Sequence, residues 1–299
     1  MPDLNQIIHE IGDLSIDSLR RKYVKILSEK TGRNVIIYYS CWLQRQEASA
    51  KVMITDADMN AFMAAIHGMD KSKGLDLVLH TPGGEVNATE ALVNYLRSYF
   101  GLNIRAFVPQ LAMSAGTMIA LSCQEIWMGK HSSIGPIDPQ INGAAAHGIV
   151  EEWNRAKEEI AQTPVLINAW EPILRKYNPT LIGECEKAIK MADEIVRKWL
   201  IDGAVHHQKA AAGASEASMQ LAVKKVLDEL GEHKKTLNHG RHVSAKTGQG
   251  IGLNVKFFED DPVLQDAVLS VHHVCTLTFA RTNLCKIVEN QHGRGLVMA

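Results

Sequence analysis

The sequence predicts an α/β protein with a mostly parallel sheet, and two observations carry that prediction. In the first half of the chain, short apolar runs rich in β-branched residues alternate with helical patterns, which is the order of parallel strands joined by crossover helices. Turns that contain glycine or proline separate these runs. With 46% hydrophobic and 22% charged residues among 299, the composition supports a sizeable core.

The elements of the first half are expected in a regular order. A charged amphipathic helix over residues 16–32 should end at Gly32, since glycine is the usual residue after a helix end. The expected strands are then 34–42, 75–81, 104–111 and 125–129, and the expected helices between them are 55–73, 87–100 and 117–123. The helix at 55–73 is predicted from a capping pattern in Thr55–Asp58.

The second half has a different character. Residues 145–230 carry mainly helical patterns, residues 252–258 predict a short strand, and residues 262–290 predict one long helix. The apolar side of that helix either packs on a neighbour or closes the core. We therefore expect a single domain over 1–299, with an α/β core at about 33–165 and a helical C-terminal extension at about 166–299.

Charge and cysteine content exclude several classes of protein. The formal net charge of −1 gives no basic footprint for nucleic acid. The five cysteines are odd in number and show no CxxC spacing, which favours reduced thiols and a cytoplasmic location. No run approaches the roughly 18 apolar residues of a membrane span, and the N-terminus is not a signal peptide. We expect no metal and no cofactor, because nothing completes a ligand set with His239 and His242.

Two strand-to-helix turns have the residues that acyl transfer needs. The second turn, in PQLAMSAGTMIAL (109–121), exposes Ser114 between small neighbours, and the following amide of Ala115 lies at a helix start. The first turn, in HTPGGEV (80–86), offers a second backbone donor, with Gly84 preferred and Gly83 as the near alternative. Taken alone, each motif is also typical of an ordinary turn, and Ser114 could simply cap its helix.

The pair HTPGG and MSAGT, followed by HSSIGPIDPQ (131–140), resembles the Clp-fold serine peptidases. It is most similar to the signal peptide peptidase A relatives, and within them to the serine dehydrogenase proteinases. The resemblance covers about 33–165 and implies a Clp protease/crotonase-like fold of repeated β-β-α units. It implies that Ser114 is the nucleophile and that the glycines of the first turn belong to the oxyanion hole. It also implies that substrate binds at Ser133, Ile134 and Gly135.

The base is a lysine in this interpretation. The position of the histidine in the Clp protease branch is taken by Ile137, which argues against a Ser-His-Asp triad. The peptidase A branch uses a Ser-Lys dyad, and Lys157 in VEEWNRAKEEI (150–160) is the matching lysine, with Lys130 as its main rival. A lysine must be partly desolvated to act as a base near pH 7, because its ordinary pKa is about 10.4.

The sequence therefore predicts a serine peptidase with a Ser-Lys dyad, acting on peptides or unfolded segments. Two alternatives are a crotonase-like enzyme acting on acyl-coenzyme A and a non-catalytic scaffold of the same fold. Ser114 argues against acyl-coenzyme A chemistry, which usually has a carboxylate at that position. The resemblance also implies a homo-oligomer. It identifies neither the natural substrate nor the number of subunits.

Overall fold

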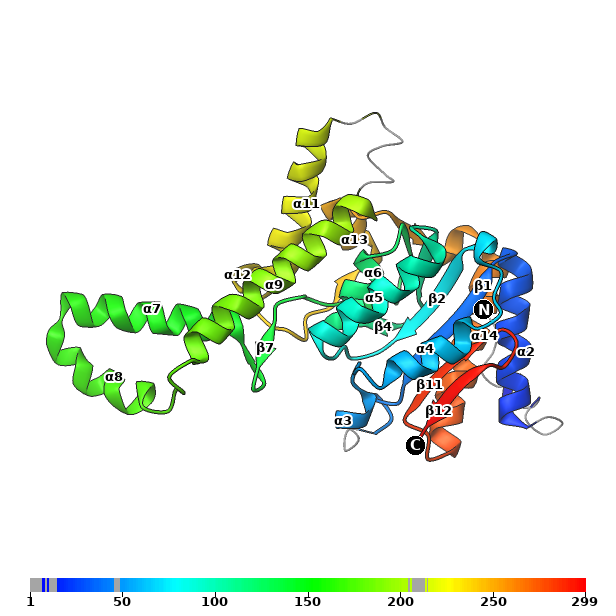
Figure 1. Cartoon of the computed structure of the whole chain (residues 1–299), viewed down its shortest axis with the longest axis horizontal. Coiled ribbons are helices and arrows are strands. Elements are labelled where there is room, and N and C mark those ends of the chain that lie inside the picture. Colours follow the sequence, from blue (N-terminus) through cyan, green and yellow to red (C-terminus); the bar gives the residue numbers. More distant parts are fainter. Residues whose placement is uncertain are drawn as a thin grey trace.

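The computed structural model describes residues 15–45, 49–203 and 215–299, together with positions 7, 8, 10, 205 and 213. Its centre is a seven-stranded, mostly parallel sheet with helices on both faces (Figure 1). In spatial order its strands are β10 (Val255–Phe257), β5 (Glu125–Met128), β3 (Ile104–Val108), β2 (Leu75–His80), β1 (Asn34–Ser40), β11 (Lys286–Asn290) and β12 (Gly295–Met298). The first five run parallel, while β11 and β12 are antiparallel to their neighbours. The α/β prediction is confirmed.

The two faces of the sheet are covered by different helices. One face packs on α4 (Asp58–Ile66), α5 (Val86–Phe100) and α6 (Ala115–Leu121). The other face packs on α2 (Ile16–Thr31) and α14 (Pro262–Arg281). Every residue of β1 and β2 is buried, as expected for central strands covered on both sides.

Several predicted boundaries differ from the observed ones. The strand expected at 104–111 stops at Val108, and Pro109 separates it from the short strand β4 (Leu111–Ala112) in another sheet. The helix expected at 55–73 is α4 alone, followed by the 3₁₀ turn η2 (Lys71–Lys73). The predicted helix at 262–290 ends at Arg281, and its last part is strand β11.

The C-terminal part of the chain is not only helical. It contains α11 (Glu216–Gly231), α12 (His233–Thr236), α13 (Ala245–Ile251) and the 3₁₀ turn η4 (Phe258–Asp260). It also supplies β10, β11 and β12 to the central sheet. The apolar side of α14, including Val268 and Val271, is buried against α2 and the sheet, so it closes the core.

A small second sheet lies where the central strands end. Its order is β4, β6 (Ser133–Ile134) and β9 (Val243–Ser244). β6 pairs parallel with β4 and antiparallel with β9. The bridge between Thr81 and Ala112 connects β4 to the end of β2. This sheet brings the three motifs 80–86, 109–121 and 131–140 together.

A helical arm projects from the body on the left of Figure 1. The hairpin of β7 (Gln140–Ile141) and β8 (Ala144–Ala145) leads into it. The arm consists of α7 (Ala146–Gln162), the 3₁₀ turn η3 (Pro164–Leu166) and α8 (Ile167–Leu174), and α9 (Leu181–Asp202) returns to the body. The remaining short helix of the described residues is α3 (Ser49–Val52). Within the described parts of the chain, no helix is both long and apolar enough to cross a membrane.

Candidate active site

Ser114 occupies a strained turn between β4 and α6. Its backbone has φ 52° and ψ −117°, a conformation that residues other than glycine rarely adopt. Such strain costs on the order of 1–3 kcal/mol and persists only where the surrounding structure fixes it. Within the described residues the Ser114 hydroxyl makes no capping hydrogen bond, so it is not an ordinary helix cap.

The first glycine of the other turn is pressed against Ser114. Gly83 has φ +108°, and a Cβ there would lie 2.7 Å from the Ser114 Cβ and 2.9 Å from the Ala115 nitrogen. Only glycine satisfies both the dihedral angle and the close approach. The two predicted turns are therefore in direct contact, and Ala115 and Gly83 adjoin the nucleophile candidate.

The second glycine of this turn, Gly84, lies against the backbone of Ile54. The Ile54 amide donates to the Gly83 carbonyl at 2.8 Å, and the Glu85 amide donates to the Ile54 carbonyl at 2.9 Å. Because backbone groups alternate along an extended chain, the amide and carbonyl of Gly84 itself turn away from Ile54. A Cβ at Gly84 would lie 2.2 Å from the Ile54 nitrogen, so this contact also requires glycine.

Hydrogen bonds from α6 tie the nucleophile turn to the third motif. The Thr117 hydroxyl donates to the Ala112 carbonyl and accepts from the Gly135 amide, both at 2.8 Å. The Gly135 backbone lies against Met113, where a Cβ would be 2.7 Å from the Met113 Cε. The segment predicted to bind substrate is therefore next to the turn of Ser114.

The predicted substrate strand has no open edge in this structure. Ser133 and Ile134 form β6, whose outer side pairs with Ser244 and Val243. On the inner side, the Ser133 amide donates to the Gln110 carbonyl at 2.8 Å. A peptide cannot add as a strand along β6 while β9 is in place.

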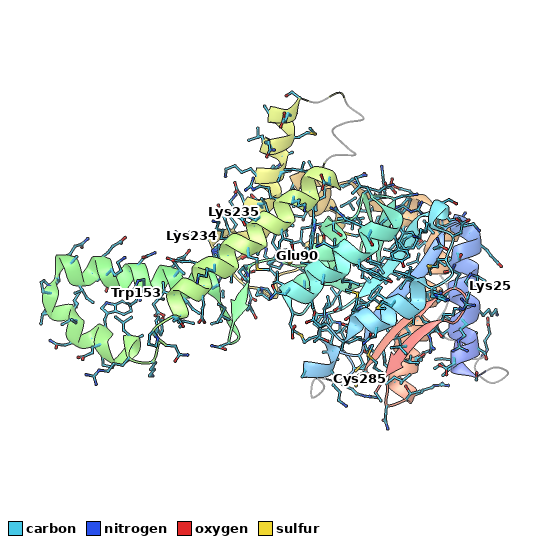
Figure 2. All side chains as sticks on the ribbon, viewed as in Figure 1. Lys25, Glu90, Trp153, Lys234, Lys235 and Cys285 are labelled. Carbon is cyan, nitrogen blue, oxygen red and sulfur yellow. The ribbon has the colours of Figure 1, made fainter. Side chains whose placement is uncertain are left out.

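The structure does not bring Lys157 to Ser114. Lys157 is exposed on α7, eleven residues after Ala146, which is about 16 Å along the helix. Figure 2 labels Trp153, one helical turn before it, on the arm that extends away from the body. The rival Lys130 is also exposed, and its amide donates to a Glu259 carboxylate on the α14 side of the sheet. A single chain thus presents the nucleophile candidate without either lysine paired to it.

Two buried histidines, His80 and His272, pack against each other where the first motif begins. His80 is fully buried, packs against Tyr39, Trp42 and His272, and neither of its ring nitrogens has a partner among the described atoms. Burial lowers the pKa of His80 to about 4. The pKa of His272 is lowered well below its usual value, mainly by burial and then by His80. Both rings are therefore neutral near pH 7.

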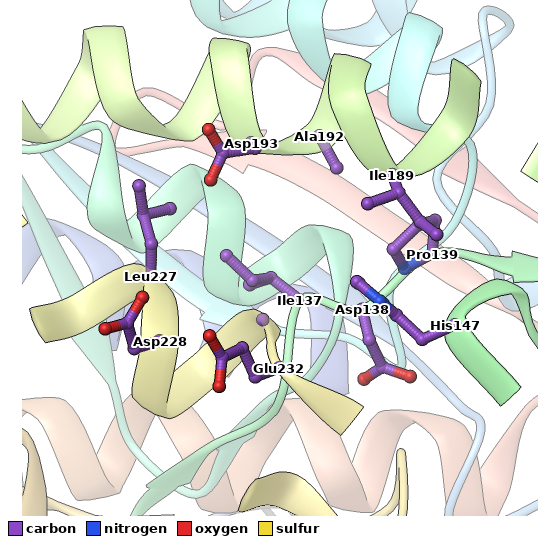
Figure 3. A pocket seen from close by; sticks show the side chains of 11 residues that line it. Ile137, Asp138, Pro139, His147, Ile189, Ala192, Asp193, Leu227, Asp228 and Glu232 are labelled. Atoms are coloured by element: carbon purple, nitrogen blue, oxygen red, sulfur yellow. The ribbon is translucent and has the colours of Figure 1, made fainter. Parts of the chain in front are cut away.

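A cavity of about 110 Å³ lies at the end of the third motif, between Ile137–Pro139, α9 and α11 (Figure 3). Apolar side chains such as Ile189 and Leu227 share its lining with carboxylates. Three of these carboxylates already have partners within the chain: Asp138 with His239, Asp193 with Arg197 and Asp228 with Lys224. We assign no ligand to this cavity.

Residues 10–217 match the family described as ClpP-like SDH-type serine proteinase. The chain belongs to this family. The resemblance to serine dehydrogenase proteinases is thereby confirmed, and so is the Clp-like fold. Membership supports a serine peptidase as the general class of activity.

Two curated relatives come from Methanocaldococcus jannaschii. The uncharacterized protein MJ1495 is 29% identical over 189 residues, covering 61% of this chain and 58% of its own length. The uncharacterized protein MJ0137 is 33% identical over 156 residues, covering 50% of this chain and 53% of its own length. The chain thus spans little more than half the length of the relatives it matches.

Among solved structures, a mutant of the 1510-N membrane-bound stomatin-specific protease is similar, with 16% identity and a TM-score of 0.38. The match covers 68% of this chain and 74% of that one. A likeness at this level adds nothing to the assignment of residues.

Sequence reasoning missed two residues next to this site. The capping pattern at Thr55–Asp58 predicts only a helix start for Asp58, and the pattern at 262–290 predicts a helix for Lys286, but the two form a buried ion pair beside Ile54. No local signal in the sequence marks this pair, because 228 residues separate Asp58 from Lys286.

Proposed function

We propose that the chain is a serine endopeptidase in which Ser114 attacks the carbonyl carbon of a peptide bond. The observation that carries this proposal is the strained, uncapped Ser114 locked against Gly83. The amides of Ala115 and Gly84 would bind the oxyanion, with Gly83 as the alternative to Gly84. Gly84 is favoured because its amide turns away from Ile54, whereas the Gly83 amide donates to the Thr81 hydroxyl at 3.2 Å.

The substrate would bind as an extended peptide beside Gly84. Backbone groups that turn away from one neighbouring strand can form a ladder with another on the opposite side. Ser133, Ile134 and Gly135 would line the substrate site, but without a ladder to the substrate, because β9 occupies the outer edge of β6. Peptides or unfolded segments fit this mode, since both can adopt an extended backbone.

We further propose that Lys157 is the base and that it comes from a neighbouring copy in a homo-oligomer. The arm that carries Lys157 points away from its own body (Figure 1). Its segments η3 and α8 carry the exposed side chains of Val165, Ile167 and Ile173. Packing the arm on a second copy would cover these side chains and desolvate Lys157. Desolvation lowers the pKa of an amine and leaves it neutral, as a base requires.

The chemistry then follows in two steps. The neutral Lys157 amine takes the Ser114 hydroxyl proton as the oxygen attacks, and the resulting ammonium protonates the departing amine of the substrate. Water then attacks the carbonyl carbon of the acyl-enzyme while Lys157 accepts a proton from it, and the ammonium returns that proton to the Ser114 oxygen as the ester bond breaks and the carboxylic acid product leaves. No cofactor is needed for either step.

The test is labelling by a fluorophosphonate probe together with cleavage of an unfolded protein. We expect wild type to react, Ser114→Ala and Lys157→Ala to fail, and Lys130→Ala to react like wild type. A Ser114→Ala variant that keeps both its activity and its labelling would overturn the proposal.

Mixing the two inactive variants tests where the base comes from. If Lys157 acts on a neighbour's Ser114, randomly mixed oligomers should recover about a quarter of wild-type activity, because half of the sites keep Ser114 and half of those meet an intact Lys157. No recovery after verified subunit exchange would place the base in the same chain as its nucleophile.

We also propose a cytoplasmic location. All five cysteines are free and buried, as expected where thiols stay reduced.

A further inference from the structure

A buried ion pair lies beside the first turn of the candidate active site. The Lys286 ammonium donates to an Asp58 carboxylate oxygen and to the Met53 carbonyl, both at 2.7 Å. The other Asp58 oxygen accepts from the Tyr38 hydroxyl at 2.9 Å and from the Thr55 amide at 3.0 Å. Both charged side chains are almost entirely excluded from solvent.

This network fixes the segment 53–55 from both sides. Lys286 binds the carbonyl of Met53, and Asp58 binds the amide of Thr55. Ile54 stands between these two anchors, and its own amide and carbonyl hold Gly83 and Glu85. The chain of contacts therefore runs from β11 to the residues on either side of Gly84.

A buried ion pair is a costly way to stabilise a core. Two apolar side chains of similar volume would often be as stable, because the charges lose their hydration. The pair supplies directional contacts to two backbone groups, which apolar side chains cannot do. Those contacts end at the segment that supports Gly83 and Gly84.

We propose that Lys286 and Asp58 are positioning residues that hold the Gly83–Gly84 turn, through Met53, Ile54 and Thr55, in the geometry that binds the oxyanion. This inference rests on the proposed function, since it assigns the purpose of the positioning to the proposed oxyanion hole. Neither residue touches the substrate in this scheme. Their effect reaches the reaction only through the backbone of the first turn.

The experiment compares two double variants, each of which removes one buried ion pair that includes a residue of β11. Asp58→Asn with Lys286→Met removes both charges together, so no lone buried charge remains, and the amide oxygen of the new side chain can still accept a hydrogen bond from Thr55. The matched control is Arg20→Met with Glu289→Gln. Arg20 and Glu289 form a buried pair at 2.8 Å on the other face of β11, against α2. The control removes a comparable ion pair that has no contact with segment 53–55.

Two readouts are measured on folded, full-length protein. The first is the rate constant of fluorophosphonate labelling, which we expect to fall at least tenfold in the Asp58/Lys286 variant and less than twofold in the control. The second is hydrogen exchange of the Ile54 and Glu85 amides, which we expect to accelerate at least tenfold in the Asp58/Lys286 variant only. Exchange is also followed in a Ser114→Ala background.

The outcomes separate this inference from the proposed function. If the Ile54 and Glu85 amides of the Asp58/Lys286 variant exchange at the same rate as in wild type, the positioning role is overturned, whether or not the protein is a peptidase. Accelerated exchange with unchanged labelling would overturn the link to the oxyanion hole. Equal losses of labelling in both double variants would indicate a general effect on stability and would also overturn it. A wild-type protein that does not label overturns the proposed function, while hydrogen exchange still decides whether the pair holds the turn.

Discussion

Replacing Gly83 by alanine should both destabilise the protein and abolish reaction at Ser114. The new methyl group would lie 2.7 Å from the Ser114 Cβ and 2.8 Å from the Met113 carbonyl oxygen. Placing a side chain at this positive φ costs about 1–2 kcal/mol. Forcing a methyl group into a filled space adds about 1–3 kcal/mol. The free energy of unfolding should therefore fall by about 2–5 kcal/mol in total.

The chain offers a matched control for this substitution. Gly252 has φ +107°, almost the same as the +108° of Gly83, but a Cβ there would meet nothing within 4 Å. Gly252→Ala should lose only the conformational part, about 1–2 kcal/mol. The entropy that alanine removes from the unfolded chain is the same in both variants and cancels in the comparison.

Urea unfolding and fluorophosphonate labelling measure the two effects. Gly83→Ala should be less stable than Gly252→Ala by about 1–3 kcal/mol, and it alone should lose labelling, because the methyl group displaces Ser114 and the Ala115 amide. Equal stability of the two variants, with wild-type labelling of Gly83→Ala, would refute the contact between the two turns.

Three further predictions concern buried groups. The histidine pKa is near 6.5 in the unfolded state and about 4 for native His80, so the stability contributed by neutral His80 is complete above pH 6.5 and is lost as the pH falls toward 4. In urea titrations at several pH values, His80→Phe should therefore lose about 3 kcal/mol less of its free energy of unfolding over this range than wild type, and an unchanged pH slope would contradict it. Thr117→Val should destabilise by about 1–3 kcal/mol in the same assay, because it leaves the buried Gly135 amide and Ala112 carbonyl unpaired, whereas a neutral effect would show that neither bond matters. Burial raises the pKa of Cys41 to about 11 and those of Cys123 and Cys275 to about 12, so iodoacetamide at pH 8 should modify these thiols only after unfolding, as followed by mass spectrometry.

The sequence was sufficient where local signals agree with the fold. The strand at Leu75–His80 and the helix at Val86–Phe100 were expected within a residue or so of their observed bounds. In each case the apolar residues keep the spacing of a single element type, strand or helix, and a glycine or a proline follows the last of them. The spacing and the turn residue therefore indicate the same boundary. Ser114 and the two glycines could be proposed as site residues for a related reason, since each lies in a short motif between two such elements.

The sequence was insufficient where a partner lies far along the chain. Nothing local distinguishes KIVEN from the end of the preceding helix, because Lys286 and Glu289 look like residues of an exposed face. Their charges are instead buried, and they are compensated by Asp58 and Arg20, which are 228 and 269 residues away. A pattern that averages over neighbouring positions cannot detect such a pairing.

The base illustrates a different limit. A motif can identify Lys157 as the matching residue, but whether this lysine can act as a base depends on what covers it. The arm on which Lys157 lies is exposed in the single chain, so the surroundings that would make it a base are supplied by neither the local sequence nor the fold of one copy.

Strand β11 shows how one element serves stability and site geometry separately. Successive side chains of a strand point to opposite faces of the sheet, so Lys286 and Glu289, three positions apart, act on different layers. Glu289 binds Arg20 and Arg21 of α2, which fastens the outer helical layer. Lys286 binds Asp58 and Met53 on the face that carries the first turn. Because the two pairs share a strand but no contact, changes on the α2 face should alter unfolding without altering the turn, and changes at Lys286 should alter the turn even where the sheet stays intact.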